Sequence, residues 1–173
     1  MNPFHRIPTR RRLRQATDRR SKKESQRGQC HRGRGLQRGS RIKLGYSRPD
    51  FDHTKIGYYG YSWGAVMGAI IPAVDSRFKV NVLALAGMEY SQSMPEVDKI
   101  NFLPRVTQPT LMLNGHYDFF FPVDSTQIPF YNLLGAKKDQ KKRIQFETGH
   151  NVPRNELIKE TLNWFDLWLG PVQ

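Results

Sequence analysis

Residues 55–71, KIGYYGYSWGAVMGAII, decide the fold because an apolar strand pattern gives way there to a helical one. We expect Lys55–Tyr61 to form a buried strand and Trp63–Ile71 to form a helix of small and apolar residues. At the junction, residues 60–64 read GYSWG, a Gly-x-Ser-x-Gly pattern whose glycines leave room for a sharp turn. Such a turn would hold the Ser62 hydroxyl above the sheet edge, although a serine that only caps the helix fits the motif equally well.

Beyond this stretch, apolar runs alternate with helical periods to the end of the chain. This alternation is typical of an α/β protein with a parallel, doubly wound sheet, here a partial one. A long polar connection over residues 88–108 and an exposed charged turn over residues 137–143 separate some of the elements. The remaining expected strands are Val80–Ala86, Thr110–Leu113 and Arg143–Glu147, and the remaining expected helices are Pro122–Leu134 and Pro153–Leu169.

Two residues that could complete a catalytic triad with Ser62 also follow predicted strands. Asp118 comes shortly after the strand that ends at Leu113, and His150 comes shortly after the strand that ends at Glu147. A serine hydroxyl needs a base to accept its proton, and that base needs a carboxylate to orient it. Because the carboxyl ends of parallel strands share one edge of a sheet, we expect the serine, aspartate and histidine to converge there.

Three segments carry a resemblance to a known family: IGYYGYSWGAVMGAIIPAVDSRF, PTLMLNGHYDFFFPVD and TGHNVPRNELIKETLNWFDLWLG. Through them, residues 47–173 resemble the carboxyl-terminal half of an α/β-hydrolase, in the dienelactone hydrolase, acetyl xylan esterase and prolyl oligopeptidase-like branch. The resemblance implies a serine hydrolase, an esterase or peptidase, that acts through an acyl-enzyme. It implies that Ser62 is the nucleophile, that His150 is the general base and then acid, and that Asp118 orients His150. It also implies that the backbone N–H of Trp63 is an oxyanion-hole donor.

The family-like sequence begins late in the fold. An α/β-hydrolase sheet has strands before the nucleophile strand, and a loop after one of them supplies the second oxyanion donor. Only about fifteen residues of family-like sequence precede Ser62. We therefore expect the amino-terminal strands to be missing, the strand Lys55–Tyr61 to lie at an exposed edge, and the activity of the isolated chain to be in doubt.

The resemblance also points to substrates and partners. Some bacterial relatives carry such a domain behind a serine/threonine protein kinase, which implies a fused or associated kinase domain. The alternative function is then a non-catalytic interaction or regulatory module that associates with such a partner. For the enzyme, we expect a small-molecule ester or peptide substrate, and the acyl-enzyme route needs no cofactor. Tyr61, Phe119 and Phe120 are candidates for the substrate pocket, although the sequence favours plain core packing for Phe119–Phe121.

The excess of positive over negative charge lies entirely in the first quarter of the chain. The 173 residues carry a net charge of +13, and residues 1–45 hold 15 Lys and Arg but only two acids. This segment has few apolar residues, so we expect a disordered basic tail, which could be foreign to the domain over residues 46–173. A nucleic-acid-binding arm and a transit peptide are alternatives for the tail, and a solvated or wrongly joined extension is the simplest one.

Several classes of site and location are disfavoured by the composition. A single cysteine excludes a disulfide framework, and we expect no metal site because no His-Glu-x-x-His or Cys-based spacing occurs. The sequence has no apolar run of 18 residues and no leader-like apolar stretch. We therefore expect a cytoplasmic protein with no membrane partner. We also expect no nucleic-acid partner, because the basic tail lacks interleaved aromatic residues.

Overall fold

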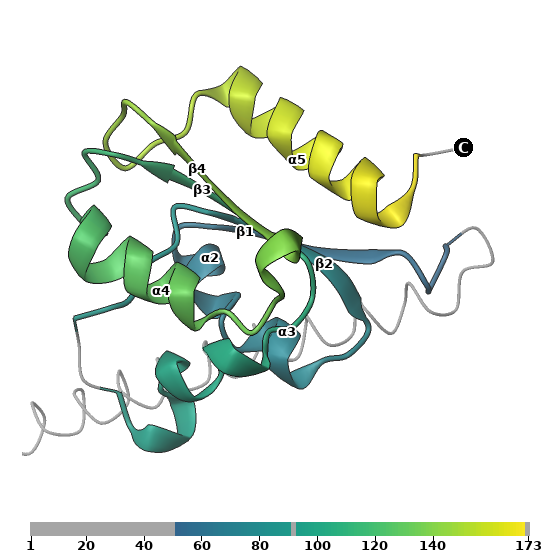
Figure 1. Ribbon diagram of the computed structural model, residues 1–173, viewed down its shortest axis with the longest axis horizontal. Coiled ribbons are helices and arrows are strands. Elements are labelled where there is room, and N and C mark those ends of the chain that lie inside the picture. Colours follow the sequence, from purple (N-terminus) through teal and green to yellow (C-terminus); the bar gives the residue numbers. More distant parts are fainter. Residues whose placement is uncertain (1–50, 91–92, 172–173) are drawn as a thin grey trace, which may run out of the picture. The chain divides into compact units, whose positions relative to one another are not determined.

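The computed structural model describes residues 51–90 and 93–171 (Figure 1). A parallel sheet runs through this part of the chain, with its strands in the order β1-β2-β3-β4. The strands are β1 (Ile56–Tyr61), β2 (Phe78–Ala84), β3 (Thr110–Gly115) and β4 (Lys141–Phe146). The predicted α/β fold with a parallel sheet is therefore confirmed, and β1 is an edge strand of the described sheet as expected. The basic tail expected over residues 1–45, and its boundary with the domain, lie outside the described residues.

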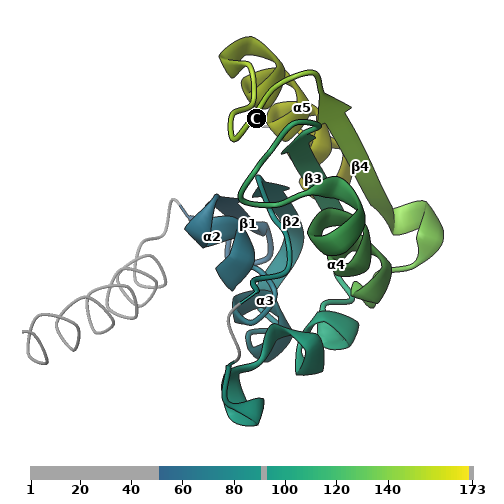
Figure 2. The same ribbon diagram turned by 90° about the vertical axis from the view of Figure 1, so that its left-hand side faces the viewer.

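Helices pack on both faces of the sheet. In Figure 1, α5 lies on one side of the sheet, and α2, α3 and α4 lie on the other. Figure 2 shows the strands in the order β1, β2, β3 and β4 from left to right. The helices are α2 (Trp63–Met67), α3 (Ile71–Val74), α4 (Ile128–Leu133) and α5 (Arg154–Leu169), with the π-helical η4 (Val123–Gln127) before α4 and short 3-10 helices η1 (Pro95–Val97), η2 (Lys99–Asn101), η3 (Leu103–Arg105) and η5 (Lys138–Gln140). No helix of the described ranges is long and apolar enough to cross a membrane.

Each face of the sheet has its own apolar core. Along β2, Val80, Val82 and Ala84 belong to the core that includes Trp164 of α5. Leu83, between them, belongs to the opposite core with residues of α2 and α4. Successive side chains of a strand point to opposite faces, so the continuous apolar run of β2 matches a strand that is covered on both sides.

The prediction of one helix over Trp63–Ile71 is wrong, because α2 ends at Met67 and a separate helix, α3, begins at Ile71. α2 ends before Gly68, whose missing side chain permits close contact with the sheet: a Cβ would lie 2.3 Å from a methyl carbon of Leu83. Pro72 lacks the N–H that a continuous helix would need, and it lies instead in the first turn of α3. The split therefore follows from one glycine and one proline.

The exposed charged turn predicted over residues 137–143 is also partly wrong, because β4 already begins at Lys141. The ammonium group of Lys141 reaches the end of α4, where it donates to the carbonyl oxygens of Tyr131 and Leu134, both at 3.0 Å. Burial lowers the pKa of Lys141. A charged residue can begin this strand because its ammonium group satisfies the terminal carbonyl groups of a neighbouring helix.

We expect the Lys141→Met variant to lose about 1–3 kcal/mol of its free energy of unfolding, since the carbonyl groups at the end of α4 lose a charged donor. Lys142→Met is the matched control, because Lys142 is the next residue of β4 and is exposed. Urea unfolding followed by circular dichroism measures both variants. Equal unfolding midpoints for the two variants would contradict this role of Lys141.

Candidate active site

Ser62 occupies a strained turn between β1 and α2. Its backbone has φ 51° and ψ −113°, a conformation that L-residues rarely adopt. The turn is held from both sides: the Ser62 N–H donates to the carbonyl oxygen of Ala84 at 2.8 Å, and the Ser62 carbonyl accepts from the N–H groups of Ala65 and Val66. Strain of this kind persists only where the surroundings impose it, and it occurs preferentially at functional sites.

The two glycines of the GYSWG pattern are not equivalent. A Cβ on Gly60 would lie 2.4 Å from the carbonyl oxygen of Gly64, so the turn requires a glycine at position 60. A Cβ on Gly64 would meet no described atom within 4 Å. The expectation that both glycines leave room for the turn therefore holds for Gly60 and is wrong for Gly64.

Asp118 lies in the loop after β3, and its side chain is buried. One carboxylate oxygen, Oδ1, accepts hydrogen bonds from the backbone N–H groups of Phe120 at 2.9 Å and Phe121 at 3.2 Å. The other oxygen, Oδ2, lies 2.8 Å from Nδ1 of His150. The carboxylate is thus fixed by its own loop on one side and directed at the imidazole on the other.

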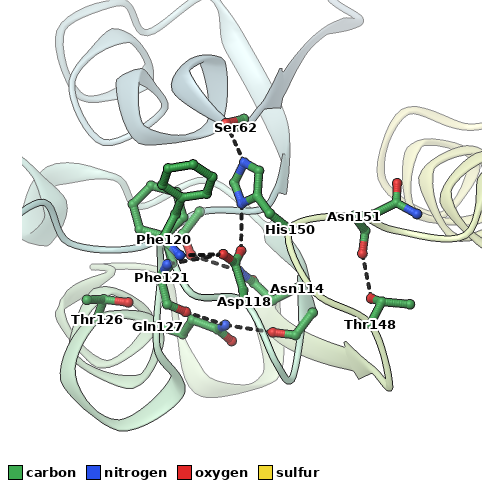
Figure 3. Close-up of polar contacts among 12 residues, drawn as sticks. Ser62, Asn114, Asp118, Phe120, Phe121, Thr126, Gln127, Thr148, His150 and Asn151 are labelled. Atoms are coloured by element: carbon green, nitrogen blue, oxygen red, sulfur yellow. Dashed lines mark hydrogen bonds and ion pairs between the residues drawn. The ribbon is translucent and has the colours of Figure 1, made fainter.

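His150 lies after β4 and connects the aspartate to the serine, as Figure 3 shows. Its Nε2 atom is 2.8 Å from the Ser62 hydroxyl oxygen. With the proton on Nδ1, the ring donates to Asp118 and accepts from the serine hydroxyl, which is the arrangement that a general base requires. The three side chains that follow β1, β3 and β4 therefore converge at one edge of the parallel sheet, as expected.

His116, two residues before Asp118, takes no part in this arrangement. It is exposed, and its ring packs edge-on against Tyr117 at 4.9 Å between centroids. Trp63, whose backbone N–H is the expected oxyanion donor, is the first residue of α2, next to Ser62. The N–H groups of Ala65 and Val66 donate to the Ser62 carbonyl oxygen. The N–H of Trp63 comes before them, among the first N–H groups of α2, at the positive end of the helix dipole.

Aromatic side chains surround the histidine. Phe119 and Phe120 are 73% and 54% exposed, so the core-packing explanation is wrong for these two residues. The Phe120 ring lies 4.8 Å from the His150 ring and 4.1 Å from the Phe119 ring. Phe121 is half-buried, and its ring is 5.8 Å from that of His150. The sequence suggested two environments for these rings, and only their exposure in the structure distinguishes them.

Tyr61 is the last residue of β1, directly before Ser62. It is partly exposed, and its hydroxyl group is 3.5 Å from Oδ1 of Asn151, the residue after His150. Across the described residues, no group of three or more His, Cys, Asp and Glu side chains is arranged to hold a metal ion. The groups gathered here are thus a hydroxyl, an imidazole, a carboxylate and aromatic rings.

Comparison with known families matches residues 54–170 to the profile of the PhoPQ-activated pathogenicity-related proteins. The chain belongs to this family. The match begins just before β1 and ends after α5. The residues matched to the PhoPQ-activated pathogenicity-related family therefore include the whole described sheet and Ser62, Asp118 and His150. No curated protein matches the chain.

Solved structures similar to this PhoPQ-related chain include esterases and a putative dienelactone hydrolase. A cold-adapted esterase from an Arctic intertidal metagenomic library is 27% identical, with a TM-score of 0.56 over 66% of this chain and 50% of the esterase. An acetyl xylan esterase from Paenibacillus sp. R4 is 20% identical, with a TM-score of 0.60 over 75% of this chain and 50% of that one. A putative dienelactone hydrolase from Klebsiella pneumoniae is 17% identical, with a TM-score of 0.59 over 70% and 56%.

The chain spans about half the length of these structures. The resemblance to the α/β-hydrolase superfamily, and to its esterase and dienelactone hydrolase branch, is confirmed at the level of the fold. The PhoPQ-related chain therefore has the parallel sheet and flanking helices of that superfamily.

The difference between the two glycines gives a direct test of the serine turn. We expect Gly60→Ala to lose about 1–3 kcal/mol of stability, because the new Cβ would overlap backbone atoms of α2. Gly64→Ala is the control, and we expect a change within about 1 kcal/mol, towards higher stability. Thermal unfolding of the two variants beside the unmodified chain measures this difference. A Gly60→Ala variant as stable as Gly64→Ala would contradict the geometry of the turn.

Proposed function

We propose that this member of the PhoPQ-activated pathogenicity-related family is a serine hydrolase that cleaves an ester, or a peptide bond, through an acyl-enzyme. The observation that carries the proposal is the unbroken pair of 2.8 Å contacts from Ser62 through His150 to Asp118. The strained backbone of the serine gives independent support. A serine that only capped α2 would accept a hydrogen bond from the first turn of the helix, and Ser62 makes no such side-chain bond within the described residues.

The proposed reaction has two halves. The Ser62 oxygen attacks the substrate carbonyl carbon while its proton passes to Nε2 of His150. The bond to the leaving group then breaks, and His150 returns the proton to that group. Water attacks the acyl-enzyme in the second half, His150 accepts a proton from it, and the acid leaves as the serine hydroxyl is restored. Asp118 accepts the hydrogen bond from Nδ1 and holds the imidazole in the required tautomer throughout.

The negative charge that develops on the carbonyl oxygen needs hydrogen-bond donors. In this proposal, the backbone N–H of Trp63 is one of them, since it lies beside Ser62 at the positive end of α2. Removal of one oxyanion donor from such a site typically lowers the rate about 10²–10³-fold. The number of donors that reach this oxygen therefore decides whether the chain is a fast or a slow hydrolase.

The names of the similar structures agree with this reaction class. They include esterases, a putative dienelactone hydrolase and, at 16% identity and a TM-score of 0.58, an acylaminoacyl peptidase from Pyrococcus horikoshii that this chain covers over 27% of its length. Ester and amide cleavage share the same acyl-enzyme chemistry, so these names support the class of reaction. A kinase domain as partner, and a cytoplasmic location, remain predictions of the sequence.

The aromatic residues define the substrate side of the proposal. His150 protonates the leaving group, and the Phe120 ring lies against His150, so Phe120 would line the leaving-group side of the site. Phe119 extends this apolar surface, and Tyr61 lies at the end of the nucleophile strand. We therefore propose that esters with an apolar or aromatic leaving group are preferred.

The nucleophile is tested by the Ser62→Ala variant. We expect hydrolysis of p-nitrophenyl acetate to fall about 10³-fold or more, because the attacking oxygen is absent. A fluorophosphonate probe should label the unmodified chain and leave the variant unlabelled, since only an activated serine reacts. Ser76→Ala, at an exposed serine in the loop before β2, serves as the control and should behave like the unmodified chain. Equal inactivity of the unmodified chain and Ser62→Ala in both assays would reject the enzymatic proposal.

The substrate side is tested by the Phe120→Ala variant. We expect kcat/KM for phenyl acetate to fall about tenfold, because an apolar leaving group loses its contact surface. Ethyl acetate is the matched control substrate, since its small leaving group has little surface to lose, and its kcat/KM should change less than about threefold. Titration of the released acid follows both substrates in the same way. A parallel loss for the two esters would exclude leaving-group recognition by Phe120.

A further inference from the structure

A buried glutamine lies directly behind the aspartate loop. Gln127 is the last residue of η4, and its side chain is 0% exposed. Neither strand periodicity nor a motif distinguishes this residue in the sequence, and the proposed reaction does not use it. A fully buried amide must find hydrogen-bond partners, and the partners of Gln127 are informative.

The amide group of Gln127 joins the two ends of the loop that carries Asp118. Its nitrogen, Nε2, donates to the carbonyl oxygen of Gly115 at 2.9 Å and to that of Phe121 at 2.7 Å (Figure 3). Gly115 is the last residue of β3, and Phe121 lies three residues after the aspartate. Both hydrogens of one amide group are therefore used to close the loop around Asp118.

The same side chain also contacts the strand that leads to the histidine. The Gln127 oxygen, Oε1, accepts from Nε2 of Gln145 in β4 at 3.3 Å. Five residues after Gln145, His150 makes its bond with Asp118. Gln127 is thus hydrogen-bonded to the loop of the acid and to the strand that precedes the base.

The bond to Phe121 matters most for the carboxylate. Asp118 is held by the backbone N–H groups of Phe120 and Phe121, so its orientation depends on where that short piece of backbone lies. Gln127 fixes the same piece from the other side, through the carbonyl group of Phe121. Without that donor, the backbone that directs Oδ2 at His150 would lose its support.

The π-helical turn of η4 gives the glutamine its position. The Gln127 N–H donates to the carbonyl oxygen of Pro122 at 3.3 Å, five residues back, and Thr126 donates to the same oxygen through its N–H and its hydroxyl group. A π-turn holds one more residue than an α-turn, which changes the direction in which the following side chains project. Such turns are frequent at functional sites.

We propose that Gln127 is a positioning residue for the Asp118–His150 pair, and this inference rests on the proposed function of that pair. A neutral side chain with two donors is what the site requires. A methionine has a similar length but no donor, and an ionised glutamate has only acceptors, which would face two carbonyl oxygens. Either substitution leaves the Gly115 and Phe121 carbonyl groups without their partner and releases the loop.

The experiment compares the full chain with its Gln127→Met variant by proton NMR. The proton between His150 Nδ1 and Asp118 gives a far-downfield resonance, which reports the hydrogen bond directly and requires no turnover. We expect this resonance in the unmodified chain, and we expect it to be lost or broadened in the variant. Gln108→Met is the matched control, because Gln108 also donates to a backbone carbonyl, that of Pro72 at 2.9 Å, outside the triad. The His150 Nδ1 resonance should be unchanged in Gln108→Met.

Kinetics provide a second measurement. We expect kcat of Gln127→Met for p-nitrophenyl acetate to fall about 10²-fold with KM changed less than about threefold, since a misplaced base affects the chemical step and not binding. A purely structural role would change the melting temperature and leave kcat and KM of the folded variant unchanged.

The outcomes separate this inference from the proposed function. An unchanged resonance in Gln127→Met overturns the inference, and so does its absence from the unmodified chain. If Gln127→Met does not fold, Gln127→Leu replaces it, since that smaller side chain also has no donor and should lose the resonance in the same way. A resonance that depends on Gln127 in a chain that neither hydrolyses esters nor reacts with a fluorophosphonate would support the inference and reject the proposed function.

Discussion

The backbone of Ser62 is held in a conformation that costs about 1–3 kcal/mol, and the arrangement of the site depends on the contacts that maintain it. The N–H of the serine is bonded to Ala84 at the end of β2, and its carbonyl group accepts the first bonds of α2. Gly60 allows the helix to approach because it has no Cβ. Strand pairing and helix packing thus stabilise together a turn that neither would form alone.

The parallel sheet and the identity of the three polar residues could be predicted from the sequence. Apolar runs mark the buried strands β2 and β3, and Ser62, Asp118 and His150 each follow a strand of a parallel sheet, whose ends share an edge. The error over Trp63–Ile71 had a local cause that the sequence contained, since Gly68 and Pro72 both disfavour a continuous helix. The late boundary assigned to β4 arose because lysines usually mark a solvated turn.

Other features of the site depend on contacts between residues far apart in the chain, and no local pattern reports them. The exposure of Phe119 and Phe120 depends on what packs against them, because the same three phenylalanines could fill a core. Gln127 is a polar residue in an otherwise ordinary amphipathic stretch, and its role follows only from the two carbonyl groups that surround its nitrogen. Even the unequal need for Gly60 and Gly64 emerges only once the distance to the next helix is known.

The aspartate and histidine loops are bonded directly to each other: the N–H of His116 donates to Phe146, and that of Tyr117 donates to Thr148. They come from adjacent strands, β3 and β4, whereas Ser62 follows β1, with β2 in between. A change in sheet twist would therefore alter the distance from serine to imidazole and leave the imidazole–carboxylate pair intact. The acid and the base thus belong to one hydrogen-bonded unit, and β2 lies between the strands that lead to this unit and the strand that leads to the nucleophile.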